Sequence, residues 1–289
     1  MSRSGLDGVL PLLACPHCSQ GMTRLDGVVG CPAGHRFDVA RQGHLSLLGS
    51  RSRTDTGDSA DMVAARGDFL GAGHYRPLAD AIARRVTAGP VLEIGAGTGY
   101  YLAAVLQRLA ADPAADARGL AIDASRYAAR RAVGADPAIG SIVADAWSRL
   151  PVRDAVVGTV LSVFAPRDPG EIVRVLAPGG RVVVATPEPD HLAEIRTDLG
   201  LLTVDPGKVE RLADSFAGRL RLVGRDDVRR LMPLSRSDVD ALVRMGPSAR
   251  HLAADRLAES VAALPVPTFV TLAVSVSVFA ADDPVDGRL

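Results

Sequence analysis

One stretch of the sequence constrains the fold more than any other, because it places a glycine-rich turn directly after an apolar run. Residues 91–100 read Val-Leu-Glu-Ile-Gly-Ala-Gly-Thr-Gly-Tyr. An aliphatic run that meets alternating glycines predicts a buried strand turning sharply into a helix. The dinucleotide-binding pattern G-x-G-x-x-G is not met, because Tyr100 stands three residues after Gly97. The observed pattern, an acidic residue followed by G-x-G-x-G, favours an α/β fold with a ligand close to the turn backbone.

Apolar segments alternate with helical ones through the middle of the chain. This rhythm predicts a parallel sheet with right-handed crossovers. The expected strands are Val91–Ile94, Leu120–Ile122, Ile142–Val143, Val156–Phe164 and Val182–Ala185, and the helices between and before them are 62–71, 76–87, 100–110, 125–133 and 169–176. Beyond Pro187 we expect helices near 190–200, 208–216, 235–245 and 253–263, and a strand over the alternating run Phe269–Phe279.

The composition is that of a globular chain, with 47% hydrophobic and 23% charged residues. No run approaches the roughly 20 apolar residues of a transmembrane helix. Leu12–Cys15 resembles a lipoprotein cleavage box, but the apolar stretch before it is short and Asp7 interrupts it. We therefore expect a cytoplasmic protein without a membrane partner.

All three cysteines lie in the first 50 residues, in a spacing typical of a zinc site. Two residues separate Cys15 from Cys18, twelve separate Cys18 from Cys31, and three separate Cys31 from His35. Three thiolates and one imidazole form the closed tetrahedral set that structural zinc prefers. A disulfide framework would leave one cysteine unpaired. We expect a structural zinc ion on these four residues, with His17 as the alternative imidazole.

Two aspartates follow the strands that come after the glycine turn. Asp123 ends the second expected strand and Asp145 follows the third. A carboxylate at such a strand end can accept hydrogen bonds from ribose hydroxyls or meet an adenine amino group, although a lone aspartate there is commonly a helix N-cap. Together with Gly95 and Gly97, the pair resembles the S-adenosylmethionine site of class I methyltransferases. We expect these four residues to bind that cofactor.

Several collinear segments resemble one family, the 23S ribosomal RNA guanine-N1 methyltransferases, some of which protect actinomycetes from macrolides. These segments are Cys15–Cys18, Cys31–His35, Phe37–Gly43, Asp55–Met62, Gly73–Leu78, Glu93–Tyr101, Val163–Pro166 and Thr186–Leu192. The resemblance implies that Tyr75, Gly97, Thr98 and His191 contact S-adenosylmethionine. It also implies a homodimer, with the zinc module docking on RNA and the reaction taking place at a guanine of a 23S hairpin loop.

The resulting fold prediction is an α/β, class I (Rossmann-like) methyltransferase with a small N-terminal zinc module. Residues 1–50 form the expected zinc-binding RNA-recognition module, 51–75 a linker and lead-in helix, and 76–289 the methyltransferase domain. The acidic residues Asp58 and Asp61 in the linker are candidates for the group that removes the guanine N1 proton; the sequence does not identify that group.

Some features favour a different function. The net charge is zero, whereas RNA-binding proteins are usually basic. The N-terminal part does lean basic, through Arg24, Arg36, Arg41, Arg51 and Arg53. Ser162 stands where the family usually has Asn, and His44 stands where it usually has Tyr. The alternative function is a small-molecule methyltransferase of antibiotic biosynthesis with a purely structural zinc site; a non-catalytic binding module is a third possibility.

Overall fold

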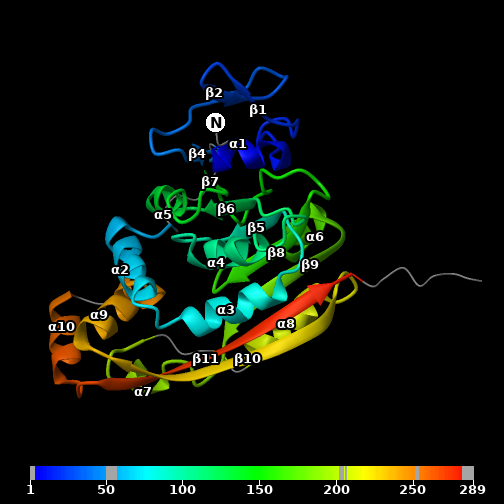
Figure 1. Cartoon of the computed structure of the whole chain (residues 1–289). Helices are drawn as coiled ribbons and strands as arrows, with labels where there is room; N and C mark the ends of the chain where they lie inside the picture. Colours follow the sequence, from blue (N-terminus) through cyan, green and yellow to red (C-terminus); the bar gives the residue numbers. More distant parts are fainter. Residues whose placement is uncertain (1–3, 50–56, 202–204, 206, 251–253, 282–289) are drawn as a thin grey trace, which may run out of the picture.

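An eight-stranded sheet organises the chain, and the computed structural model describes residues 4–49, 57–201, 205, 207–250 and 254–281. The strand order is β10-β11-β9-β8-β5-β6-β7-β4 (Figure 1). Neighbouring strands from β4 to β9 are parallel, whereas β11 is antiparallel to both β9 and β10. The strands are β4 (Leu45–Ser46), β5 (Val91–Ile94), β6 (Gly119–Asp123), β7 (Ile139–Val143), β8 (Val157–Val163), β9 (Leu176–Pro187), β10 (Arg221–Leu234) and β11 (Thr268–Ala280).

Helices cover both faces of this sheet, because successive strand residues point to opposite sides. The first face packs against α2 (Ala60–Gly71), α3 (Arg76–Arg85), α4 (Tyr100–Leu109), α9 (Arg236–Arg244) and α10 (Ala254–Ala263). The second face packs against α1 (Gly5–Val9), α6 (Pro169–Val175) and α8 (Lys208–Phe216). The remaining helices are α5 (Arg126–Ala132), the short α7 (Ala193–Arg196), and the 3-10 turns η1 (Leu10–Leu12) and η2 (Pro247–Arg250). Among the described helices, none combines the length and apolar character needed to cross a bilayer.

The N-terminal segment is built onto one edge of the sheet. Its own small sheet consists of β1 (Thr23–Leu25), β2 (Val28–Gly30) and β3 (Arg36–Phe37), after which β4 pairs in parallel with β7. Helix α1 packs so closely on β7 that a Cβ on Gly5 would lie 2.1 Å from the Ile139 carbonyl oxygen. Buried side chains of this segment and of the sheet therefore form one continuous hydrophobic cluster.

Most of the expected strands and helices are confirmed, with two exceptions after Pro187. The expected helix 190–200 is wrong in length, because only α7 forms there, and β10 was not predicted at all. β10 carries charged residues on both faces and is largely exposed at the sheet edge, so it lacks the alternation that marks a half-buried strand. The strand expected to end at Phe164 ends at Val163, because Phe164 has a positive φ of 54°. The linker residues 50–56, including Arg51, Arg53 and Asp55, lie outside the described residues.

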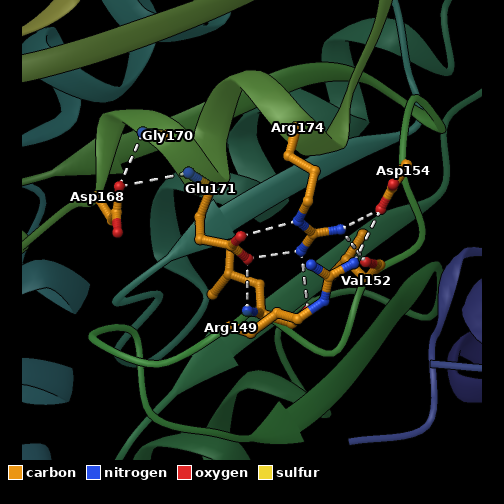
Figure 2. A network of polar contacts seen from close by, with 8 residues as sticks. Arg149, Val152, Asp154, Asp168, Gly170, Glu171 and Arg174 are labelled. Atoms are coloured by element: carbon orange, nitrogen blue, oxygen red, sulfur yellow. Dashed lines mark hydrogen bonds and ion pairs between the residues drawn. The ribbon is translucent and has the colours of Figure 1, made fainter. Parts of the chain in front are cut away.

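A polar network caps the start of α6 and ties this helix to the segment before β8, as Figure 2 shows. The Asp168 carboxylate caps α6 by accepting hydrogen bonds from the backbone N–H groups of Gly170 (2.7 Å) and Glu171 (3.3 Å). One helical turn later, Arg174 donates to the carboxylates of Glu171 (2.6 Å) and Asp154 (2.6 Å). These bonds hold the start of α6 in place, and with it the end of the loop that follows β8.

Candidate active site and zinc centre

The zinc ligands are presented by two tight turns at the ends of a short hairpin. In the first turn the Ser19 N–H donates to the Cys15 carbonyl at 2.8 Å, and Ser19 has a positive φ of 60°. In the second turn the Gly34 N–H donates to the Cys31 carbonyl at 3.0 Å, and Gly34 has a positive φ of 86°, which glycine adopts without strain. Each turn therefore aims its two ligand side chains at the same point.

The four ligand atoms lie within 4.8 Å of one another. The Sγ atoms of Cys18 and Cys31 are 3.5 Å apart, and the Nδ1 atom of His35 lies 3.4 Å from Cys31 Sγ and 3.5 Å from Cys15 Sγ. Zinc–sulfur bonds of about 2.3 Å in a tetrahedron require ligand atoms at such separations. The donor set leaves no open position, so the zinc ion at this site is structural.

His17 is not part of this cluster. Its ring stacks on Phe37, with centroids 5.8 Å apart and an interplanar angle of 11°, and tilts against the ring of the ligand His35 at 4.9 Å. The structure brings the three cysteines and His35 together and leaves His17 outside the group. His17 and Phe37 instead form a stacked pair of rings beside the ligand His35.

The glycine turn lies at the carboxyl end of β5, where the strand order reverses between β6 and β8. Gly95, Gly97 and Gly99 all have positive φ values, of 69°, 54° and 77°. A Cβ on Gly95 would lie 2.6 Å from the Ala165 Cβ, and one on Gly97 would lie 3.1 Å from a guanidinium nitrogen of Arg66. Larger residues would therefore close the space above the turn. In open α/β sheets such a switch point is where ligands bind.

Asp123 is the acid nearest to the turn. Its Oδ2 accepts a hydrogen bond from the Gly97 N–H, and its Oδ1 accepts one from the Ser125 N–H, both at 2.8 Å. Each carboxylate oxygen retains a second lone pair for a hydroxyl donor, as a ribose diol would supply. Burial raises the pKa of Asp123. The interior acid Glu93 lies below the turn, where it accepts from the Leu102 N–H at 3.2 Å and burial raises its pKa to about 8.

Asp145 lies two residues beyond the end of β7 and is buried. Its carboxylate accepts hydrogen bonds from the Trp147 N–H (2.9 Å) and the Ser148 hydroxyl (3.1 Å). The carboxylate therefore organises its own turn, and because no helix lies between β7 and β8, a segment that the structure describes in full, the helix N-cap interpretation is wrong for Asp145. A role toward adenine stays a prediction, and the neighbouring Trp147, 58% exposed, is the residue that the sequence did not single out there.

Tyr75 and His191 meet although they are far apart in the sequence. The Ala273 N–H donates to His191 Nδ1 at 3.2 Å, which leaves the ring proton on Nε2 in the neutral form. Nε2 lies 3.3 Å from the Tyr75 hydroxyl, so His191 donates to Tyr75 and the phenol proton is available to another acceptor. Burial lowers the pKa of His191 to about 4, which keeps the imidazole neutral. Phe164 stacks on His191, with centroids 5.9 Å apart.

The linker candidates differ in their surroundings. Asp58 forms an ion pair with Arg66 at 2.5 Å, and its carbonyl accepts from the Ser125 hydroxyl at 2.6 Å. Asp61 is exposed in the first turn of α2. Arg66 was missed by sequence reasoning, because a single arginine in a helix carries no motif. Thr98 lies within the turn and is partly exposed, and its contact with the cofactor stays a prediction.

The strand order, with its antiparallel β11 and the glycine turn after β5, defines a class I S-adenosylmethionine-dependent methyltransferase. The Cys3His cluster adds a structural zinc ribbon. The backbone approach at the turn and the partly buried carboxylate of Asp123 fit the cofactor of this class, a nucleoside without phosphate.

Comparison with known proteins identifies the family. The family model for the N-terminal zinc ribbon of RlmA matches residues 13–53. A Micromonospora griseorubida protein, provisionally named 23S rRNA (guanine-N(1)-)-methyltransferase, is 45% identical over 92% of this chain and 96% of its own length. The 23S rRNA (guanine(748)-N(1))-methyltransferase of Streptomyces fradiae is 44% identical over 93% and 97%. A provisionally named Bacillus subtilis relative is 31% identical over 64% and 67%. The chain belongs to the 23S rRNA (guanine-N(1)-)-methyltransferase family.

Proposed function

We propose that this enzyme transfers the methyl group of S-adenosylmethionine to N1 of a guanine in a hairpin loop of 23S ribosomal RNA. The observation that carries this proposal is the similarity to two relatives of that name, which extends over more than nine tenths of the chain. It spans the zinc ribbon and the methyltransferase sheet together. A small-molecule methyltransferase that uses the ribbon only for stability would need no such joint similarity.

The residues of this chain orient the reactants and form no covalent bond with them. S-adenosylmethionine, when bound, supplies an activated methyl group. Asp123 would accept hydrogen bonds from the ribose, and the bare backbone at Gly95 and Gly97 would let the cofactor approach. The Tyr75 hydroxyl accepts a hydrogen bond from His191, which orients its O–H group. This O–H group would donate to the carboxylate of the methionine moiety. Alignment of this kind lowers a barrier by roughly 7–11 kcal/mol in well-oriented reactions.

The zinc ribbon is proposed to dock the RNA. Arg36 and Arg41 are exposed on it, while Arg24 pairs with Asp7 at 2.7 Å. A guanine in a folded loop has to leave its stack to reach the glycine turn. We propose that the protein acts in the cytoplasm as a homodimer, in which two ribbons would enclose the RNA. Macrolide resistance would follow where the methylated guanine contacts the drug.

A methyl-transfer assay with labelled cofactor and unmodified 23S RNA tests the proposal. We expect one guanine to acquire the label and to block primer extension, because a methyl on N1 removes Watson–Crick pairing. An RNA carrying adenosine at that position serves as the matched control and should take up no label. Transfer to a small metabolite alone would instead support the biosynthetic alternative, and no transfer to either would favour a non-catalytic module.

A further inference from the structure

The guanidinium of Arg167 lacks a counter-charge in the loop between β8 and α6. Its Nη1 atom lies 3.3 Å from the Ala165 carbonyl and 3.5 Å from the Ser162 hydroxyl, and both partners are neutral. Within the described ranges of the chain, no carboxylate pairs with it. Burial lowers the pKa of Arg167, yet an arginine stays charged at neutral pH. A partly buried, unpaired cation is costly unless another molecule supplies the negative charge.

The acids on the elements that adjoin the Arg167 loop form other contacts. Asp168, the next residue, uses its carboxylate to cap α6, and Glu171 pairs with Arg174 (Figure 2). Glu188, just past the end of the neighbouring strand β9, pairs with Arg225 at 2.8 Å. The charge of Arg167 is therefore available to a ligand, and the capped helix holds the backbone that carries it.

The loop of Arg167 lies against the cofactor turn. Ser162 is paired with Ile94, the residue before Gly95, and a Cβ on Gly95 would touch Ala165. Phe164 in the same loop has a positive φ, is 41% exposed, and stacks on His191. One loop thus presents an exposed aromatic face and a cation next to the place where the methyl donor binds. An aromatic face and a guanidinium are the groups with which proteins hold an unstacked base.

We propose that Arg167 is a catalytic residue that donates hydrogen bonds to O6 of the target guanine, while Phe164 supports the plane of the base. This inference rests on the proposed function. When the N1–CH3 bond forms, the S–CH3 bond breaks and its electron pair stays on sulfur, and the N1 proton passes to solvent water. Loss of that proton places negative charge on O6. A fixed guanidinium stabilises this charge as oxyanion-stabilising donors do.

The test is the single-turnover methylation rate of the full-length protein on 23S RNA across pH 6–9. The Arg167→Gln variant should lose ~100-fold in rate at neutral pH, as removal of one such donor typically costs. Its rate should also rise with pH over a range where the wild-type rate is already flat, because N1 then loses its proton without help. Arg167→Lys should keep part of the rate, and its rate should be flat over the same pH range as the wild-type rate.

Two measurements separate this role from a structural one. Of the titratable groups around the loop, His191 and Tyr75 stay neutral over this range, whereas burial raises the pKa of Glu93, which pairs with Leu161 of β8, to about 8. Wild type and both variants share Glu93, so the difference between their pH profiles reports on Arg167. Cofactor affinity should stay unchanged in both variants, which also shows that they are folded. Arg181→Gln, an exposed arginine at the opposite end of the β9 pairing, is the matched control and should leave rate and pH profile unchanged.

Two outcomes overturn the inference. If Arg167→Gln methylates the same guanine with the wild-type rate and pH profile, Arg167 does not touch O6. If its rate falls together with cofactor affinity, and Arg167→Lys does not restore it, Arg167 only shapes the loop. Failure of the wild-type protein to methylate 23S RNA would instead reject the proposed function, which this inference presupposes.

Discussion

The zinc centre and the cofactor site are assembled in opposite ways. All four zinc ligands lie between residues 15 and 35, and two short turns bring them within 4.8 Å. The polar groups of the proposed cofactor site come from residues 58 to 191, and only the sheet brings them together: Asp123 from the end of β6, Tyr75 from the start of α3, and His191 from beyond β9. The first site is local and the second depends on the fold.

This difference predicts how each site responds to damage. A local site held by metal loses its structure when one ligand is lost, because the metal supplies the folding free energy. A distributed site keeps its shape when one polar side chain changes, because the sheet and its helices hold the backbone. A single side-chain substitution should therefore unfold the ribbon when it removes a zinc ligand. At the glycine turn a substitution of similar size should weaken cofactor binding and leave the fold intact.

Loss of a zinc ligand should have the largest effect. Cys31→Ser should bind no zinc and unfold the ribbon, since metal binding contributes on the order of 10 kcal/mol or more to such modules. The thermal midpoint of the whole protein should fall as well, because Leu13 and Leu45 share a hydrophobic cluster with Ile142 of the sheet. Zinc content and thermal unfolding measure both effects.

The non-ligand His17 provides the control for that experiment. His17→Asn removes a ring stacked on Phe37 but no ligand, so stoichiometric zinc should remain. If Cys31→Ser retained one zinc per chain, the ligand assignment would fail. If it lost zinc with an unchanged midpoint of the main transition, the ribbon would be energetically independent of the sheet.

The contrast also explains what the sequence could predict. The Cys3His set follows from spacing alone, because a two-residue gap between cysteines closes one turn. Strands β5 to β9 follow from their apolar runs, and Asp123 from its place after β6. Arg66 and the meeting of Tyr75 with His191 could not be derived from local pattern, because they depend on how α2, α3 and β11 pack. For the latter pair only the family resemblance carried a signal.

Strand β10 is a part of the fold that local sequence could not predict either. Its sequence, with Asp226, Asp227, Arg229 and Arg230 in one run, has too few apolar residues to predict a strand. Pairing with β11 along its whole length determines its conformation instead. A charged edge strand also resists pairing with further chains. The charged composition that prevents the prediction of β10 is thus the composition that an exposed edge strand requires.

A change at the distributed site should have a smaller and different effect. Asp123→Asn should weaken S-adenosylmethionine binding about 10- to 100-fold, because hydrogen bonds to a charged group are worth roughly 1.5–3 kcal/mol. Zinc content should stay at one per chain. Isothermal titration with the cofactor measures the affinity, and Asp112→Asn, an exposed residue in the turn between α4 and β6, is the control. An unchanged affinity for Asp123→Asn would show that Asp123 only holds the turn.

The smallest expected effect is on the pH dependence of the free energy of unfolding. It arises from His191, which belongs to the distributed site and not to the ribbon. The pKa of His191 is about 4 in the folded protein and 6.5 in the unfolded chain, since burial opposes its charge. Between these values the unfolded state binds more protons, so the free energy of unfolding rises with pH and is lost as pH falls. The expected loss from pH 6.5 to 5.5 is about 1 kcal/mol.

Zinc release in acid would also destabilise the protein, because metal binding requires deprotonated ligands, so the comparison needs the variant His191→Gln. Glutamine can accept from the Ala273 N–H and donate to Tyr75 but does not titrate. Urea unfolding at pH 5.5 and 6.5, with zinc in excess, should give a smaller pH dependence for the variant, and what remains belongs to the ribbon and other groups. Equal slopes for the two proteins would mean that His191 takes up its proton as readily in the folded state as in the unfolded one.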